Sequence, residues 1–153
     1  MAFTIAIVLQ IRHKQFSFSS LVLMGVGILF ILRGAIGGGI ALLSGAEGSR
    51  FPLEWLQGTP FKDYTIPALL LTIVVGGSSL SACITMFRNL KNSIVLSLAA
   101  GSIMVGFIVV EVLILKQIPP GPTPIEKMYF ILGFVTLLLA GFLWLKDKRE
   151  GLT

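Results

Sequence analysis

The sequence has very few of the residues on which most catalytic and metal-binding sites depend. Its 153 residues include one cysteine, Cys83, and one histidine, His13. A single cysteine cannot form an intramolecular disulfide or a paired-thiol redox site, and a lone histidine cannot supply two haem ligands or a zinc site. No nucleophile stands beside a base. We therefore expect no metal, no cofactor and no enzymatic activity.

Charged residues are also scarce. They make up 12% of the chain, against 55% hydrophobic residues, whereas soluble domains are about a quarter charged. The mean hydropathy of +0.94 points to lipid rather than water as the solvent. The net charge is +5, but the basic residues lie in short breaks between apolar runs and form no stripe with interleaved aromatics. This pattern excludes nucleic acid as a partner.

Four apolar stretches are each long enough to cross the roughly 30 Å of hydrocarbon in a bilayer. The predicted spans lie at about 17–44, 66–86, 93–115 and 128–145. The predicted fold is all-α, an integral membrane antiparallel four-helix bundle, with residues 1–153 as a single membrane domain. Three glycines at 37–39 predict a bend in the first span. Residues 2–9 are too few to cross and are interpreted as an interfacial lead-in.

The connections between the spans differ in length and chemistry. Residues 87–92 form a tight polar turn, and residues 116–124 contain four prolines, which cannot continue a helix. In the longest connection, 45–65, Pro52 and Gly58 are typical of a helix start and stop, so we expect a short interfacial helix at 52–57. The candidate surface residues of this outer loop are Glu54, Trp55, Asp63 and Tyr64.

The distribution of lysine and arginine predicts the orientation. One side of the four spans has four basic residues; the other has seven, namely Arg12, Lys14, Arg88, Lys91, Lys146, Lys148 and Arg149. The richer side is expected to be cytoplasmic. The prediction is a multi-pass protein of a bacterial plasma membrane, with the N- and C-termini in the cytoplasm and the outer loop outside.

Small residues recur on one face of each span. Lipid supplies no hydrophobic force between helices, so helices associate where small side chains allow close approach. The predicted helix-packing residues are Gly34, Gly38, Gly76, Ser79, Gly101 and Gly133.

Arg33 and Glu111 are the basic and the acidic side chain that the predicted spans place within hydrocarbon. An arginine at mid-helix costs on the order of 3 kcal/mol there, so such residues are functional candidates. Both fall in the outer half of the membrane, where we expect them to interact directly or through one water. The pair either fixes which helices are neighbours or forms a polar site under the 54–64 loop. As a third option, Arg33 reaches outward to lipid phosphate.

The stretch PLEWLQGTPFKDYTIP at 52–67, with a first span that ends in a glycine-rich turn, resembles a group of small four-span bacterial membrane proteins, loosely DoxX-like in size and layout. The resemblance implies a bacterial plasma membrane and a structured 58–67 loop, and brings no established activity. The small multidrug exporters are similar in size but have their essential glutamate in the first span, where this chain has Arg33.

Three functions remain open. The leading hypothesis is a non-enzymatic accessory component that interacts with another membrane protein or with further copies of itself in the lipid bilayer. The alternative is a small carrier or channel subunit for a small anion, a proton or an amphiphile, which would use Arg33 and Glu111 and require a homo-oligomer. The third is a lipid- or quinone-binding component that uses the outer loop and Tyr64.

The predicted orientation can be tested with fusions to alkaline phosphatase, an enzyme that is active only outside the cytoplasm. Fusions at either terminus should be inactive, and an insertion after Gly58 in the outer loop should be active, because the lysine and arginine count places these sites on opposite sides. Active phosphatase at one terminus and not at the other would contradict the four-span topology.

Overall fold

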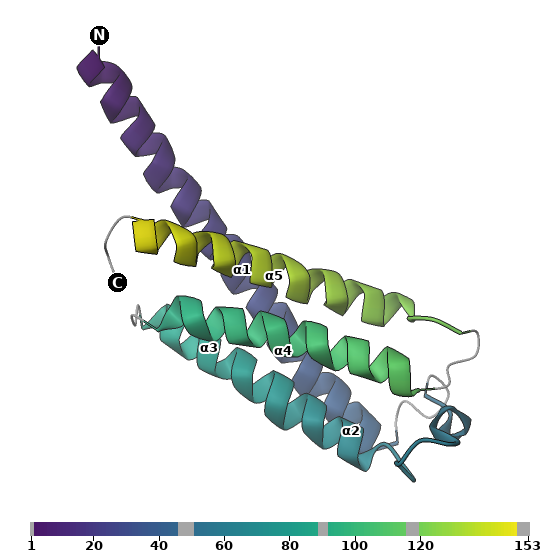
Figure 1. The fold of residues 1–153 in the computed structure, drawn as a ribbon. Helices are drawn as coiled ribbons and strands as arrows, with labels where there is room; N and C mark the ends of the chain where they lie inside the picture. Colours follow the sequence, from purple (N-terminus) through teal and green to yellow (C-terminus); the bar gives the residue numbers. More distant parts are fainter. Residues whose placement is uncertain (1, 46–50, 89–91, 116–119, 150–153) are drawn as a thin grey trace.

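The computed structural model describes residues 2–45, 51–88, 92–115 and 120–149, with side chains from Leu21 onward (Figure 1). Within these residues the chain is helical and has no strand, which confirms the all-α prediction. The elements are α1 (Ala2–Leu43), the 3₁₀ helix η1 (Leu53–Leu56), α2 (Thr65–Leu69), the π-helical segment η2 (Leu70–Gly76), α3 (Gly77–Phe87), α4 (Ser93–Ile114) and α5 (Pro124–Arg149).

Four helical segments of the described chain are long and apolar enough to cross a membrane. They are Leu21–Leu43, Thr65–Phe87, Ser93–Ile114 and Pro124–Arg149. Each overlaps one of the four stretches expected from the sequence. The second segment combines α2, η2 and α3, and its π-helical turns were not predicted from the sequence.

The first helix, α1, is much longer than the predicted span. It remains α-helical from Ala2 through the glycines at 37–39 to Leu43. At about 1.5 Å per residue its 42 residues reach about 63 Å, and Figure 1 shows its N-terminal part projecting beyond the other helices. One continuous helix thus replaces the expected lead-in and bend, because contacts to Gly39 offset the poor helix propensity of glycine.

Some helices approach each other closely at glycines, which have no side chain. A Cβ atom on Gly101 would lie 3.0 Å from the carbonyl oxygen of Gly133 and 3.0 Å from the backbone nitrogen of Leu137. This contact brings α4 against α5 at backbone distance. At Gly133 a Cβ would lie 3.1 Å from Met104. Both positions were predicted as packing sites, and a larger side chain at either would push the two helices apart.

Two glycines of α1 lie in close contact with different neighbours. A Cβ on Gly34 would overlap the ring of Tyr129 in α5, and one on Gly39 would overlap Thr72 in η2. A Cβ on Gly38 would meet one methyl group of Leu71 at the ordinary distance of 3.5 Å. The close approach to η2 is therefore at Gly39 rather than at the predicted Gly38, one residue and about 100° around the helix.

Buried side chains form two clusters along the helices. One surrounds Met24 and Ile28 of α1, and the other surrounds Val75 of η2 and Met104 of α4. Two predicted packing residues, Ser79 and Gly76, are buried, and the Ser79 hydroxyl has no hydrogen-bond partner among the described residues. The core is therefore made of small and medium-sized side chains that let the helices lie close together.

The outer surface of the helices is apolar. Leu113 is 78% exposed, Ile73 is 65% exposed and Ile131 is 59% exposed. These side chains lie on α4, η2 and α5, so the apolar exterior is shared by several helices. Exposed apolar surface of this extent is unfavourable in water and favourable in lipid.

Replacing Gly101 with alanine should destabilise the protein by about 1–3 kcal/mol, because the added methyl group meets backbone atoms that cannot rotate away. The matched control is Gly106→Ala on the same helix, where a Cβ has no atom within 4 Å. That change should leave stability unchanged or raise it by up to about 1 kcal/mol through helix propensity. Thermal unfolding in detergent measures both, and equal melting temperatures for the two variants would contradict the α4–α5 contact.

Candidate functional site

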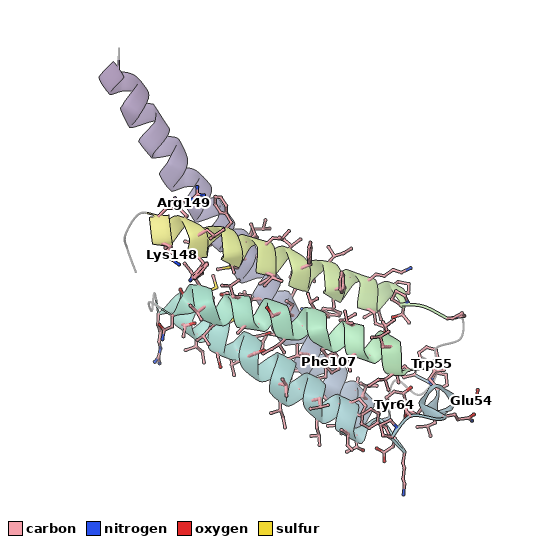
Figure 2. All side chains as sticks on the ribbon, in the orientation of Figure 1. Glu54, Trp55, Tyr64, Phe107, Lys148 and Arg149 are labelled. Atoms are coloured by element: carbon pink, nitrogen blue, oxygen red, sulfur yellow. The ribbon has the colours of Figure 1, made fainter. Side chains whose placement is uncertain are left out.

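The outer loop is folded against the ends of the helices. The Tyr64 hydroxyl donates a 3.0 Å hydrogen bond to the carbonyl oxygen of Pro52, and the ring of Phe51 packs edge-on against both Trp55 and Tyr64. Tyr64 also joins a small buried cluster with Leu115, at the end of α4. Figure 2 shows Glu54, Trp55 and Tyr64 together at this end of the protein. The described part of the loop thus covers one end of the helices.

The four predicted surface residues have different surroundings. Glu54, Asp63 and Tyr64 line one surface hollow of about 560 Å³, and Trp55 is not part of its wall. The Asp63 carboxylate accepts a 2.9 Å hydrogen bond from the backbone N–H of Thr65, which lowers the pKa of Asp63. Asp63 therefore satisfies the backbone N–H of Thr65, the first residue of α2. Residues 46–50 of the predicted loop lie outside the described residues.

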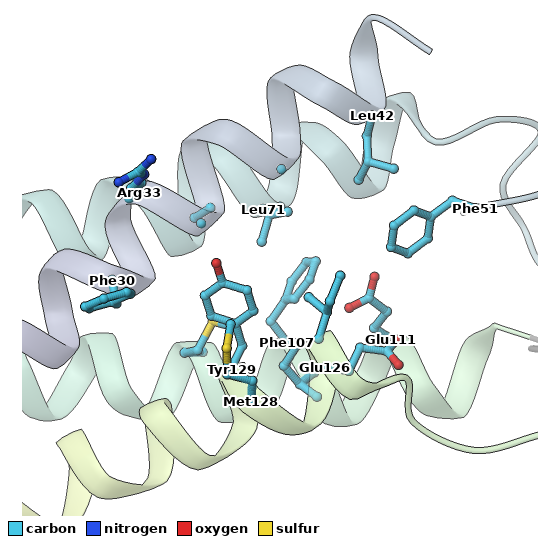
Figure 3. A pocket seen from close by; sticks show the side chains of 16 residues that line it. Phe30, Arg33, Leu42, Phe51, Leu71, Phe107, Glu111, Glu126, Met128 and Tyr129 are labelled. Atoms are coloured by element: carbon cyan, nitrogen blue, oxygen red, sulfur yellow. The ribbon is translucent and has the colours of Figure 1, made fainter. Parts of the chain in front are cut away.

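A cavity of about 650 Å³ lies between α1, α4 and α5 (Figure 3). Its walls are mostly apolar and aromatic, with Phe107 from α4 and Tyr129 from α5. The loop residue Phe51 closes one end. Ligand pockets in proteins typically have volumes of about 300–1,000 Å³, so the cavity is large enough for a small molecule.

Arg33 and Glu111 line this cavity, but their charged groups are not brought together. Figure 3 shows the Arg33 guanidinium at one end, pointing away from the cavity, and the Glu111 carboxyl at the other end near Phe51. Arg33 is an exposed residue. The direct pair expected from their matching depth does not form, because Gly34 is the residue that faces α5 and the helical rotation turns Arg33 outward.

The acidic neighbour of Glu111 is Glu126, which the sequence analysis missed. Glu126 is 3% exposed and lines the same cavity. Its carboxylate accepts a hydrogen bond from the backbone N–H of Thr123, and the Thr123 hydroxyl accepts one of 3.3 Å from the backbone N–H of Glu126. This is a capping box, with Pro124 at the first helical position of α5.

The sequence carried a signal for Glu126. Thr-Pro-Ile-Glu at 123–126 has the capping-box spacing, and a helix that begins at Pro124 includes the glutamate. The predicted span began at 128, so Glu126 was left in the connection. With the helix start corrected, Glu126 belongs to the first turn of α5 and lies at the same cavity end as Glu111.

Tyr64 extends this acidic end of the site towards the outer loop. Burial and, to a smaller extent, the negative charge of Glu111 raise the pKa of Tyr64 to about 12. The phenol is therefore neutral at physiological pH and remains a hydrogen-bond donor to Pro52. Across the described residues no group of three or more histidine, cysteine, aspartate or glutamate side chains is placed to hold a metal ion.

Comparison with known protein families, with curated proteins and with solved structures finds no match. The function must therefore be argued from the residues of this chain. Its chemistry consists of two carboxyl groups at the end of an apolar cavity and one arginine on an outer helix face. Such groups can bind charged partners.

The Tyr64 environment predicts an unusual alkaline titration. In Tyr129→Phe, which leaves Tyr64 as the single tyrosine, tyrosinate absorbance should rise near pH 12 rather than near pH 10. Because the folded pKa lies above the unfolded value, folding stability should fall as pH rises from about 10 to about 12. A tyrosinate transition near pH 10 in the folded variant would show that Tyr64 is not buried against the loop.

Proposed function

We propose that this chain is a multi-pass protein of a bacterial plasma membrane, an antiparallel four-helix bundle with both termini in the cytoplasm. The four apolar helical segments and their exposed apolar side chains support this proposal. Helices satisfy their own backbone hydrogen bonds, as hydrocarbon requires. Lys148 and Arg149 lie at the opposite end of the helices from Glu54 (Figure 2), as expected if the basic end is cytoplasmic.

Within the membrane, the proposed role is that of a non-enzymatic accessory component that binds another membrane protein. The observation that carries this proposal is the exposure of Arg33 on the outer face of α1. Arg33 is the one charged residue of the segment Leu21–Leu43. Leaving it in contact with acyl chains costs on the order of 3 kcal/mol, and an anionic partner would remove this cost.

Arg33 lies inside the apolar layer rather than at its edge. The adjacent Gly34 packs on Tyr129, which lies about 8 Å along α5 from Pro124 at 1.5 Å per residue. Ala35 packs near Gly76, about 16 Å along the second segment from Thr65. Tyr129 and Gly76, which lie beside this part of α1, are both well inside their helices, so Arg33 is also well inside the apolar layer. An anionic group within that layer is therefore a better partner for Arg33 than one at the membrane surface.

The face of α1 around Arg33 suits a helix as partner. Leu29, Ile36 and Ile40 are exposed and follow the helical spacing of Arg33, and one side of Ile36 also packs near Gly76 of η2. Gly37, one turn beyond Arg33, is exposed and has no atom within 4 Å of a Cβ position, so another helix can approach closely there. We define this surface, Leu29, Arg33, Ile36, Gly37 and Ile40, as the arginine face.

The partner that fits the arginine face is a membrane helix with a carboxylate at the depth of Arg33. A second copy of this chain fits less well, because Glu111, the one acid of the Ser93–Ile114 segment, lines the internal cavity. A carboxylate from a different chain would pair with Arg33 in hydrocarbon. Without this pairing, each of the two charges would lie in hydrocarbon with no counter-charge, which is costly.

Photo-crosslinking in native membranes tests this interaction. A benzophenone side chain at Ile36, on the arginine face, should give a protein adduct. Arg33→Gln should reduce the adduct about ten-fold or more, which corresponds to a loss of at least 1.4 kcal/mol. Arg33→Lys keeps the charge and should retain most of the adduct.

The matched control carries the same crosslinker at Leu113, an exposed residue of α4 outside the arginine face. It should give lipid adducts and no Arg33-dependent protein adduct. A protein adduct at Ile36 that survives Arg33→Gln unchanged, or only lipid adducts at both positions, would contradict the proposed partner. Two differently tagged copies in one adduct would identify the partner as the chain itself.

A further inference from the structure

The cavity between α1, α4 and α5 shares Arg33 in its wall with the arginine face, but its acidic end has its own chemistry. Both acidic groups lie at one end of it, while the Arg33 guanidinium points away from the other end (Figure 3). The interior is therefore apolar along most of its length and acidic at the end nearest the outer loop. This asymmetry favours a molecule with an apolar body and a charged end.

The two carboxyl groups, of Glu111 and Glu126, line the same end of the cavity (Figure 3). Two like charges in an apolar site are costly, and a cation placed between them relieves the repulsion. The Glu126 carboxylate accepts a hydrogen bond from the backbone N–H of Thr123, and each carboxylate can accept several hydrogen bonds.

Aromatic rings surround the acidic end. Figure 3 shows Phe51 and Phe107 beside the two carboxyl groups. The faces of aromatic rings attract cations, with energies of about 2 kcal/mol or more where water is excluded. Carboxylates and rings thus favour the same charge at the same place, and neither favours an anion.

The opposite part of the cavity opens towards the surroundings of the helices. Its wall includes Phe30 of α1 and Met128 of α5, both exposed side chains. In a bilayer these residues would contact acyl chains, so a ligand could enter from the lipid between α1 and α5. A water-soluble ion with no apolar part would lack that route.

We propose that the cavity binds a hydrophobic cation, with the positive group between Glu111 and Glu126 and the apolar body along the aromatic wall. This site goes beyond the proposed partner interaction, because Glu111 and Glu126, which would hold the cation, are not part of the arginine face. The chemistry defines the ligand as an amphiphilic or aryl-substituted cation that partitions into membranes.

Tetraphenylphosphonium and tetraphenylborate provide the test, because they have nearly the same shape and opposite charge. Equilibrium dialysis of the full chain in neutral detergent should show saturable binding of tetraphenylphosphonium and weaker binding of tetraphenylborate. Glu111→Gln and Glu126→Gln should each weaken tetraphenylphosphonium binding about ten-fold or more, the equivalent of one 1.4 kcal/mol interaction. Glutamine can keep the capping box, so Glu126→Gln removes the charge and retains the start of α5.

The matched control is Glu54→Gln, which removes an exposed carboxylate that does not line the cavity. It should bind tetraphenylphosphonium as the unmodified protein does. If Glu111→Gln fails to fold, Glu126→Gln with an unchanged melting temperature decides. Equal affinity for the two ions, no saturable tetraphenylphosphonium binding, or unchanged affinity in the folded glutamine variant would overturn the proposal. The crosslink at Ile36 should be unaffected by Glu126→Gln, which separates this site from the partner interaction.

Discussion

The apolar exterior of the helices is the constraint on which the rest of the structure depends. Side chains such as Leu113 and Ile73 are exposed, and no described part of the chain covers them. Hydrocarbon, the environment we propose, cannot bond to free backbone groups. The hydroxyls of Thr72 and Ser97 accordingly donate hydrogen bonds within their own helices, to the carbonyl oxygens of Ala68 and Ser93. Without a hydrophobic force between them, the helices associate at backbone contacts such as Gly101 with Gly133.

The same constraint separates the charges of the protein. Arg33 stands on an outer face of α1, while Glu111 and Glu126 line an internal cavity. Each charge is costly in hydrocarbon, and Figure 3 shows the Arg33 guanidinium and the Glu111 carboxyl at different ends of the cavity. The outer charge is best explained by a protein partner and the inner pair by a cationic ligand. Neither proposal requires covalent chemistry.

Much of the helical layout could be predicted from the sequence, because length and hydropathy are properties of single segments. The predicted stretch 93–115 and the observed Ser93–Ile114 nearly coincide. Packing sites were harder, because they depend on helix rotation: Gly101 and Gly133 do meet, but Gly39 rather than Gly38 touches η2. The outward direction of the Arg33 side chain depends on the same rotation of α1. The expected pair with Glu111 was inferred from the depth of the two residues in the membrane, and depth gives no information on rotation.

Other features were missed for local reasons. The π-helical turns of η2 leave no periodic signal in an apolar run. Glycines at 37–39 predicted a bend, yet the close contact at Gly39 keeps α1 helical. The capping-box pattern that begins at Thr123 was present in the sequence. The start of the last span was instead placed by hydropathy at residue 128, which left Glu126 outside the helix α5. Intrinsic propensity and hydropathy therefore predicted the elements better than their ends or their contacts.

Collision measurements on spin labels test most directly whether hydrocarbon surrounds the helices. In a Cys83→Ala background, labels at the exposed α4 positions Ser102 and Val109 would be compared with one at Glu54 in phospholipid vesicles. The account predicts that oxygen, which dissolves in lipid, collides more often than a water-soluble nickel chelate at Ser102 and Val109, and less often at Glu54. Nickel collisions at Ser102 as frequent as those at Glu54 would contradict it.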